Sequence, residues 1–75
     1  MDANAIQKRA KTYVKHMFGQ DLDSLLYLGK DEGMEGYNIY EFKVFLKDKR
    51  EFYLNIIEIP KGEKTELVYD LTPKD

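Results

Sequence analysis

The stretch from Tyr37 to Leu71 holds three runs of alternating apolar and polar residues, separated by two short polar breaks. Alternation with a period of two is typical of a β-strand that packs one face on a core. The runs are also rich in aromatic and branched residues, which strands favour. They therefore predict three strands of an antiparallel sheet, over residues 37–47, 51–59 and 65–71.

The apolar faces of the first two runs predict how these strands pair. Residues directly opposite each other in an antiparallel pair share a face. We therefore expect an odd-numbered loop around residues 48–50, because an even-numbered loop would turn polar side chains onto the core face. The expected pairs are Leu46 with Phe52, Val44 with Leu54, and Phe42 with Ile56.

The third run is matched to the second in the same way. This places Lys61 and Gly62 at the centre of the turn, where glycine can take the positive φ of a tight hairpin. Pro60 has no N–H to donate, so it is tolerated at a strand end. The expected pairs are Leu67 with Ile56, Tyr69 with Leu54, and Leu71 with Phe52.

Residues 3–18 show a different period. Their apolar residues recur at spacings of three and four, which predicts an amphipathic helix. Gly19 follows them, as is typical just beyond a helix C-terminus, and Asp2 or Asn4 can cap the start. The expected buried stripe comprises Ala3, Ile6, Ala10, Tyr13, Val14 and Met17.

The segment between the helix and the three runs predicts one more strand. Leu25–Leu28 indicate a short strand over about residues 24–29, and Gly29–Gly36 a loop or wide hairpin. The sequence leaves open whether this strand lies beside residues 37–47 or at the far side of the sheet.

These elements define an α+β fold in a single small domain, residues 1–75, with the order α-β-β-β-β. One N-terminal amphipathic helix is expected to pack on one face of a four-stranded antiparallel sheet. This element order resembles that of PepSY-type domains, and the resemblance implies a protein-binding or inhibitory role. The helix is expected to cover Phe42, Val44, Leu54, Ile56, Leu67 and Tyr69.

Composition excludes several function classes. The chain has no cysteine, so it can form neither a disulfide framework nor a thiolate metal site. No apolar run is long enough to span a membrane, and the first residues do not resemble a secretory signal, so we expect a cytoplasmic protein. A net charge of −2 argues against nonspecific binding to nucleic acid.

The sheet face turned away from the helix is the strongest candidate site. A solvated face alternates to polar residues, whereas this one carries six large apolar or aromatic side chains on two neighbouring strands. We expect a protein partner or a homodimer there, unless the 29–36 loop or the C-terminal tail covers the face. The uncovered edge of residues 65–71 is an alternative route of association. The predicted interaction residues are Tyr37, Ile39, Phe45, Tyr53, Ile57 and Ile59.

The basic face of the helix is a second candidate, because lysines aligned along a helix can meet phosphates. A solvated helix face explains the same residues, and the acidic segment that follows can neutralise them. The residues for this alternative, nucleic-acid binding, are Lys8, Arg9, Lys11 and Lys15.

Nothing in the sequence predicts catalysis, a cofactor or a small-molecule substrate. His16 is the only histidine, so it has no partner for a triad or a paired metal site. A carboxylate cluster can bind a cation weakly, but here the spacing of a helix-loop-helix calcium site fails, because Leu25 and Leu26 fall where a ligand and a glycine are required. We therefore assign no metal site to the acidic residues Asp21, Asp23, Asp31, Glu32 and Glu35.

Overall fold

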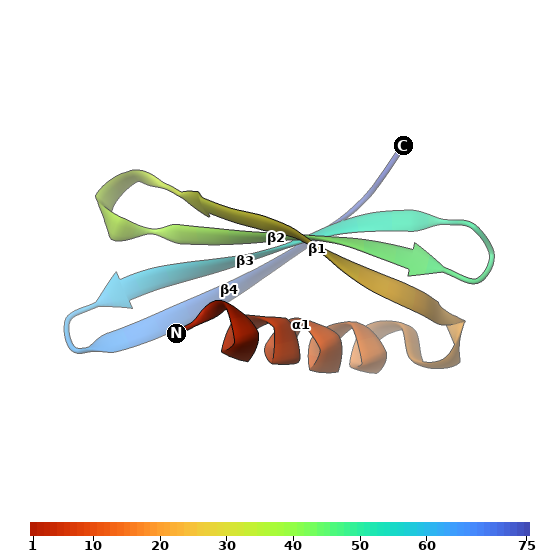
Figure 1. Ribbon diagram of the computed structural model, residues 1–75, viewed down its shortest axis with the longest axis horizontal. Helices are drawn as coiled ribbons and strands as arrows, with labels where there is room; N and C mark the ends of the chain where they lie inside the picture. Colours follow the sequence, from red (N-terminus) through yellow and green to blue (C-terminus); the bar gives the residue numbers. More distant parts are fainter.

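The computed structural model describes all 75 residues, Met1–Asp75. Its four strands form one antiparallel sheet in the order β1-β2-β3-β4, and α1 lies across one face of it (Figure 1). This confirms the predicted fold class. The elements are α1 (Ala3–Phe18), η1 (Gly19–Asp21), β1 (Leu22–Glu32), η2 (Met34–Gly36), β2 (Asn38–Leu46), β3 (Glu51–Lys61) and β4 (Lys64–Pro73).

Helix α1 begins and ends at residues suited to those positions. The Asp2 side chain accepts a hydrogen bond of 2.8 Å from the Ala5 N–H, so Asp2 rather than Asn4 is the cap. Gly19, at φ 55°, donates its N–H to the Lys15 carbonyl. Met17 departs from the expected buried stripe, since it is 50% exposed; Phe18 makes the apolar contact of the last turn instead, with its ring 5.0 Å from that of Phe52.

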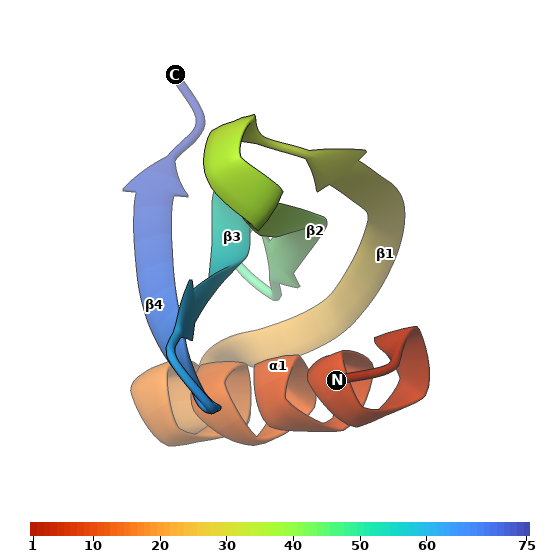
Figure 2. The same ribbon diagram turned by 90° about the vertical axis from the view of Figure 1, so that its left-hand side faces the viewer.

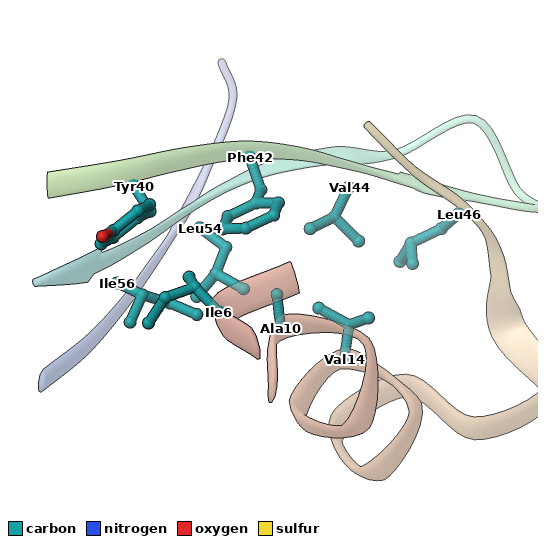
Figure 3. Close-up of a cluster of buried hydrophobic side chains, with 9 residues drawn as sticks. All are labelled: Ile6, Ala10, Val14, Tyr40, Phe42, Val44, Leu46, Leu54 and Ile56. Atoms are coloured by element: carbon teal, nitrogen blue, oxygen red, sulfur yellow. The ribbon is translucent and has the colours of Figure 1, made fainter. Parts of the chain in front are cut away.

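The core lies between α1 and the sheet (Figure 3). Four of the six sheet residues expected under the helix are buried, and the other two, Leu67 and Tyr69, are half-buried and pack against the core. The Tyr13 ring stacks on Tyr69 at 4.7 Å, which fastens the helix to β4. The buried apolar residues are Ile6, Ala10, Val14, Tyr40, Phe42, Val44, Leu46, Leu54 and Ile56.

Strand β1 is longer than predicted, and its place in the sheet is now defined. It pairs with β2 and runs to Glu32, so the first half of the predicted 29–36 loop is strand. Two irregularities interrupt the pairing, one between Leu22 and Ser24 and one between Tyr27 and Gly29. Gly29 takes φ 142°, a conformation that suits glycine at such a bulge.

The β2–β3 pairing corrects the predicted register by two residues. Phe52 lies opposite Val44, not Leu46, and Phe42 lies opposite Leu54. The loop is odd-numbered, as expected, but it lies one residue earlier, at residues 47–49, where Leu46 donates its N–H to the Arg50 carbonyl and Lys49 takes φ 77°. A two-residue slip keeps every side chain on the same face, so the apolar pattern cannot distinguish the two registers.

The β3–β4 pairing shows the same kind of correction. Tyr69 lies opposite Ile56 and Leu71 opposite Leu54, which centres the turn on Gly62 and Glu63. Gly62 has φ 63°, as predicted for the turn glycine, and it is the first of the two loop residues, where a type II′ turn requires a positive φ.

The sheet is twisted and curved (Figure 2). Strands β1 and β4 form its two sides, and α1 runs across the opening between them. The molecule measures 41 × 22 × 16 Å, with a radius of gyration of 12.7 Å against about 11 Å for a compact chain of this length. No helix is long and apolar enough to cross a membrane.

Candidate interaction surfaces

The sheet face turned away from α1, here called the outer face, carries a row of apolar side chains across three strands. Ile39 of β2 lies opposite Ile57 of β3, and Ile57 lies opposite Val68 of β4. Opposed residues share a face, so the three side chains form one continuous apolar row. Val68 is 38% exposed and was not among the predicted residues, although it follows from the same alternation along β4.

A second apolar group lies further along the outer face. Tyr53 lies opposite Lys43, and Lys43 lies opposite Leu26 of β1. The Lys43 ammonium sits 5.3 Å from the ring centre of Phe45 and 5.9 Å from that of Tyr53. Leu26 is 49% exposed, and it was missed because the position of β1 in the sheet was open.

A polar row separates these two apolar groups. Glu41 lies opposite Asn55, and Asn55 lies opposite Asp70. The six predicted interaction residues therefore do not form one patch. Phe45 and Tyr53 lie on one side of the polar row, and Ile39 and Ile57 lie on the other, with Ile59 two residues further along β3 and Tyr37 just before β2.

The 29–36 loop and the C-terminal tail, the two candidate covers of the outer face, reach only its margins. A side-chain carbon added at Gly33 would lie 3.7 Å from Ile39 Cδ1, so the hairpin loop touches one end of the apolar row. The tail instead continues beside β3, where Lys74 donates its N–H to the Glu51 carbonyl. Glu51 also binds the ammonium groups of Lys43 and Lys74, at 2.9 and 3.3 Å.

The second surface is an open groove of about 1050 Å³ between α1 and β1, here called the α1–β1 groove. The flank of the helix contributes Lys8, Lys11 and Lys15, which share one side at helical spacing. Arg9, grouped with them in the sequence, does not line the groove. The apolar lining residues are Leu22, Leu25, Tyr27 and Phe42.

The acidic residues are spread by strand β1 rather than gathered. Asp23 lies near the start of β1, while Asp31 and Glu32 end it, about 26 Å away at the rise of an extended strand. No three of the chain's histidine and carboxylate side chains come together in a group that could hold a metal. His16 is exposed in the last turn of α1.

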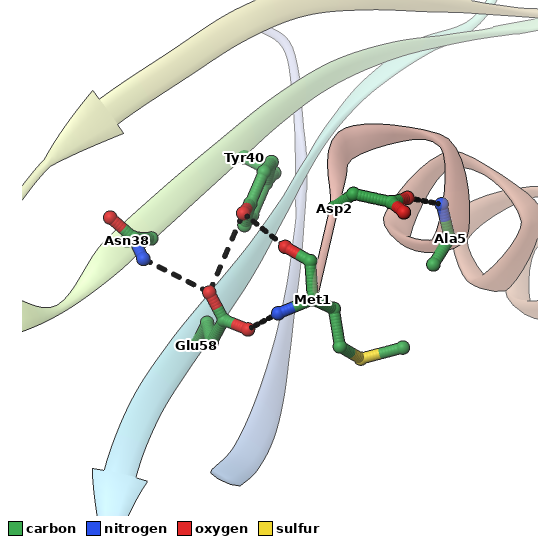
Figure 4. A network of polar contacts seen from close by, with 6 residues as sticks. All are labelled: Met1, Asp2, Ala5, Asn38, Tyr40 and Glu58. Carbon is green, nitrogen blue, oxygen red and sulfur yellow. Dashed lines mark hydrogen bonds and ion pairs between the residues drawn. The ribbon is translucent and has the colours of Figure 1, made fainter.

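Glu58 is the one buried charged residue, at 7% exposure (Figure 4). Its carboxylate accepts hydrogen bonds from the Met1 ammonium at 2.5 Å, from the Asn38 amide at 3.0 Å and from the Tyr40 hydroxyl at 3.4 Å. The Met1 ammonium and then the Asn38 amide hold the pKa of Glu58 below its usual range. Sequence reasoning missed this network, although Glu58 falls on the apolar face of β3 and a carboxylate there needs partners.

The chain matches no family model, no curated protein and no solved structure.

Proposed function

We propose that this chain is a small, non-enzymatic, cytoplasmic domain that acts by protein–protein contact and forms a homodimer through its outer face. The observation that carries the proposal is the row of Ile39, Ile57 and Val68, which has no second layer over it. Contiguous apolar groups on a sheet face are typical of interaction sites. Two such faces can pack as a β-sandwich, with the strands of the two sheets nearly aligned.

The surface of the molecule supports this proposal. The chain exposes 5325 Å², about 500 Å² more than the roughly 4,800 Å² expected for a compact monomer of 8.9 kDa. A stable interface buries about 800 Å² on each partner. Covering both apolar groups of the outer face would remove much of the excess and extend a core that has only nine buried apolar residues.

Concentration-dependent NMR spectra of the labelled protein test which surface associates. We expect amide signals of Ile39, Ile57 and Val68 to shift between dilute and concentrated samples, while those of the buried helix residues stay in place. Shifts confined to β4 on its free edge would indicate edge pairing instead and contradict the outer-face dimer. Spectra that stay unchanged up to the highest concentration, with diffusion still that of a monomer, would also contradict it.

A second candidate is a nucleic-acid accessory role for Lys8, Arg9, Lys11 and Lys15. It is favoured by one observation, that Lys8, Lys11 and Lys15 share a flank of α1 and form no ion pair. This role predicts binding that weakens steeply with salt. Flat titrations with single- and double-stranded DNA and RNA at low salt would contradict it.

A further inference from the structure

The free edge of β1 borders the α1–β1 groove. Strand β1 is the first strand of the sheet, and beyond Leu22, whose N–H donates to the Gly19 carbonyl, its backbone pairs with β2 alone. Its other side therefore presents unpaired N–H and C=O groups, which can accept a further strand. Between the two bulges, Ser24–Tyr27 are in regular register, so the edge available for pairing is about four residues long.

The walls of the groove define what such a strand would meet. Leu25 and Tyr27, on the face toward the helix, pack against the core but are only half-buried. A strand added at the β1 edge would cover them with the methylene groups of the side chains that it turns toward the helix. The adjacent residues Leu22 and Phe42 extend the same apolar floor.

The charge of the groove is complementary to an acidic ligand. Lys8, Lys11 and Lys15 are exposed and unpaired, and Asp23 is the only acidic residue that lines the groove. From Lys8 to Lys15 the helix rises about 10 Å, which is the length of about three residues of an extended strand. Acidic side chains at alternate positions of such a strand can each reach a lysine.

These observations favour a peptide over a lipid or nucleic acid. The groove is open along its length, so a hydrocarbon chain would stay partly in water, and neither a lipid nor a nucleic acid brings the peptide groups that the β1 edge lacks. We propose that the α1–β1 groove binds an extended acidic segment of another protein, which adds to β1 as a fifth strand and places carboxylates beside Lys8, Lys11 and Lys15.

An NMR titration with a defined probe tests this inference. The probe is a capped eight-residue peptide in which glutamate and valine alternate. We expect it to shift the amide signals of residues 8–15 and 22–27, and to slow hydrogen exchange at amides of Ser24–Tyr27. A peptide with lysine in place of glutamate should not bind, and neither should one with proline in place of valine, because it cannot extend the sheet.

Matched variants separate the groove from general electrostatics. Lys11→Glu with Lys15→Glu should weaken binding of the glutamate–valine peptide by about tenfold or more, because two ion pairs become repulsive contacts. The control, Arg9→Glu with Lys64→Glu, makes the same change of net charge outside the groove and should change affinity by no more than about threefold.

Three outcomes would overturn the inference. The first is the absence of any shift in the groove at millimolar peptide, and the second is equal weakening by both variant pairs. The third is that a 12-nucleotide single strand or the unlabelled protein itself shifts the groove signals while the peptide does not. The first two outcomes do not bear on the outer-face dimer, because the two surfaces lie on opposite faces of the sheet, whereas self-association at the groove would contradict both proposals.

Discussion

Ile39 and Ile57 lie directly opposite each other on β2 and β3, on the face of the sheet that α1 leaves open. Val68 continues the pair onto β4, so that three β-branched side chains form one row across three of the four strands. On the other face, at the neighbouring pair, Tyr40 lies opposite Ile56 inside the core. The same strands therefore carry apolar side chains on both faces, and the helix covers only one of them.

Truncating Ile6 should destabilise the domain strongly. Ile6 is fully buried between α1 and the sheet, so Ile6→Ala removes apolar contacts and leaves a cavity. We expect a loss of about 2–5 kcal/mol in the free energy of unfolding, measured by urea denaturation. Met17→Ala, on the same helix but half exposed, should cost less than about 1 kcal/mol. Equal losses for both variants would mean that the helix does not pack as described.

The acid stability of the domain should depend on Glu58. The pKa of this carboxyl is lowered in the folded state by the Met1 ammonium, and next by the Asn38 amide. Its contribution is thus fully present above the unfolded pKa of about 4.3 and is lost as the pH falls through the lower folded pKa. Glu58→Gln should flatten the fall in unfolding free energy below about pH 4.5, measured by denaturant titrations at several pH values.

The dependence of the unfolding free energy on pH will not vanish in Glu58→Gln. The Lys43 ammonium lowers the pKa of Glu51, and the Arg50 N–H lowers that of Asp48, so both still favour the folded state above their pKa values. Glu63→Gln is the matched control, because Glu63 lies exposed in the β3–β4 turn and makes no hydrogen bond or ion pair. If Glu58→Gln retains the full wild-type slope, the network of Figure 4 does not contribute to acid stability.

Placing glycine at Lys49 and removing it at Gly62 should change the free energy of unfolding in opposite directions. Lys49 has φ 77° and Gly62 has φ 63°, and both angles favour glycine. Lys49→Gly is expected to stabilise the domain by about 0.5–1 kcal/mol, because it relieves the left-handed conformation of a lysine. Gly62→Ala is expected to destabilise it by about 1–2 kcal/mol for the converse reason. Thermal unfolding measures both, and a change of the same sign would contradict the turn geometry.

The fold was predictable because the helical spacing of residues 3–18 and the strand alternation after Tyr37 are both regular. The strand registers were not predictable from the same pattern. Leu46 and Phe52 share a face whether the loop is centred on Asp48 or on Lys49, so the apolar pattern fixes parity alone. The deciding contacts are local: the Asp48 carboxylate accepts the Arg50 N–H at 3.1 Å, and Lys49 turns left-handed. Aspartate two residues before a backbone donor is a known turn signal, and it favours the loop at residues 47–49.

The candidate surfaces were predictable only in part, for a related reason. The alternation placed Ile57 and Tyr53 on the outer face, but a single strand pattern does not show which neighbours complete a surface. Leu26 joins the outer face only because β1 pairs with β2, and Lys8, Lys11 and Lys15 line a groove only because β1 is the edge strand beside α1. Both facts depend on the placement of one strand, which the sequence left open.

Light scattering across a concentration series, on the wild type and on Ile57→Glu, tests the central claim most directly. We expect the wild type to approach twice the mass of 8.9 kDa and the variant to remain at that mass, because a carboxylate at the centre of the apolar row would be buried unpaired in a dimer. Met17→Glu, which adds the same charge on the helix, should dimerise like the wild type, and circular dichroism should show all three proteins folded. A folded Ile57→Glu that is as associated as the wild type, or a wild type that stays monomeric at high concentration, would contradict the outer-face dimer.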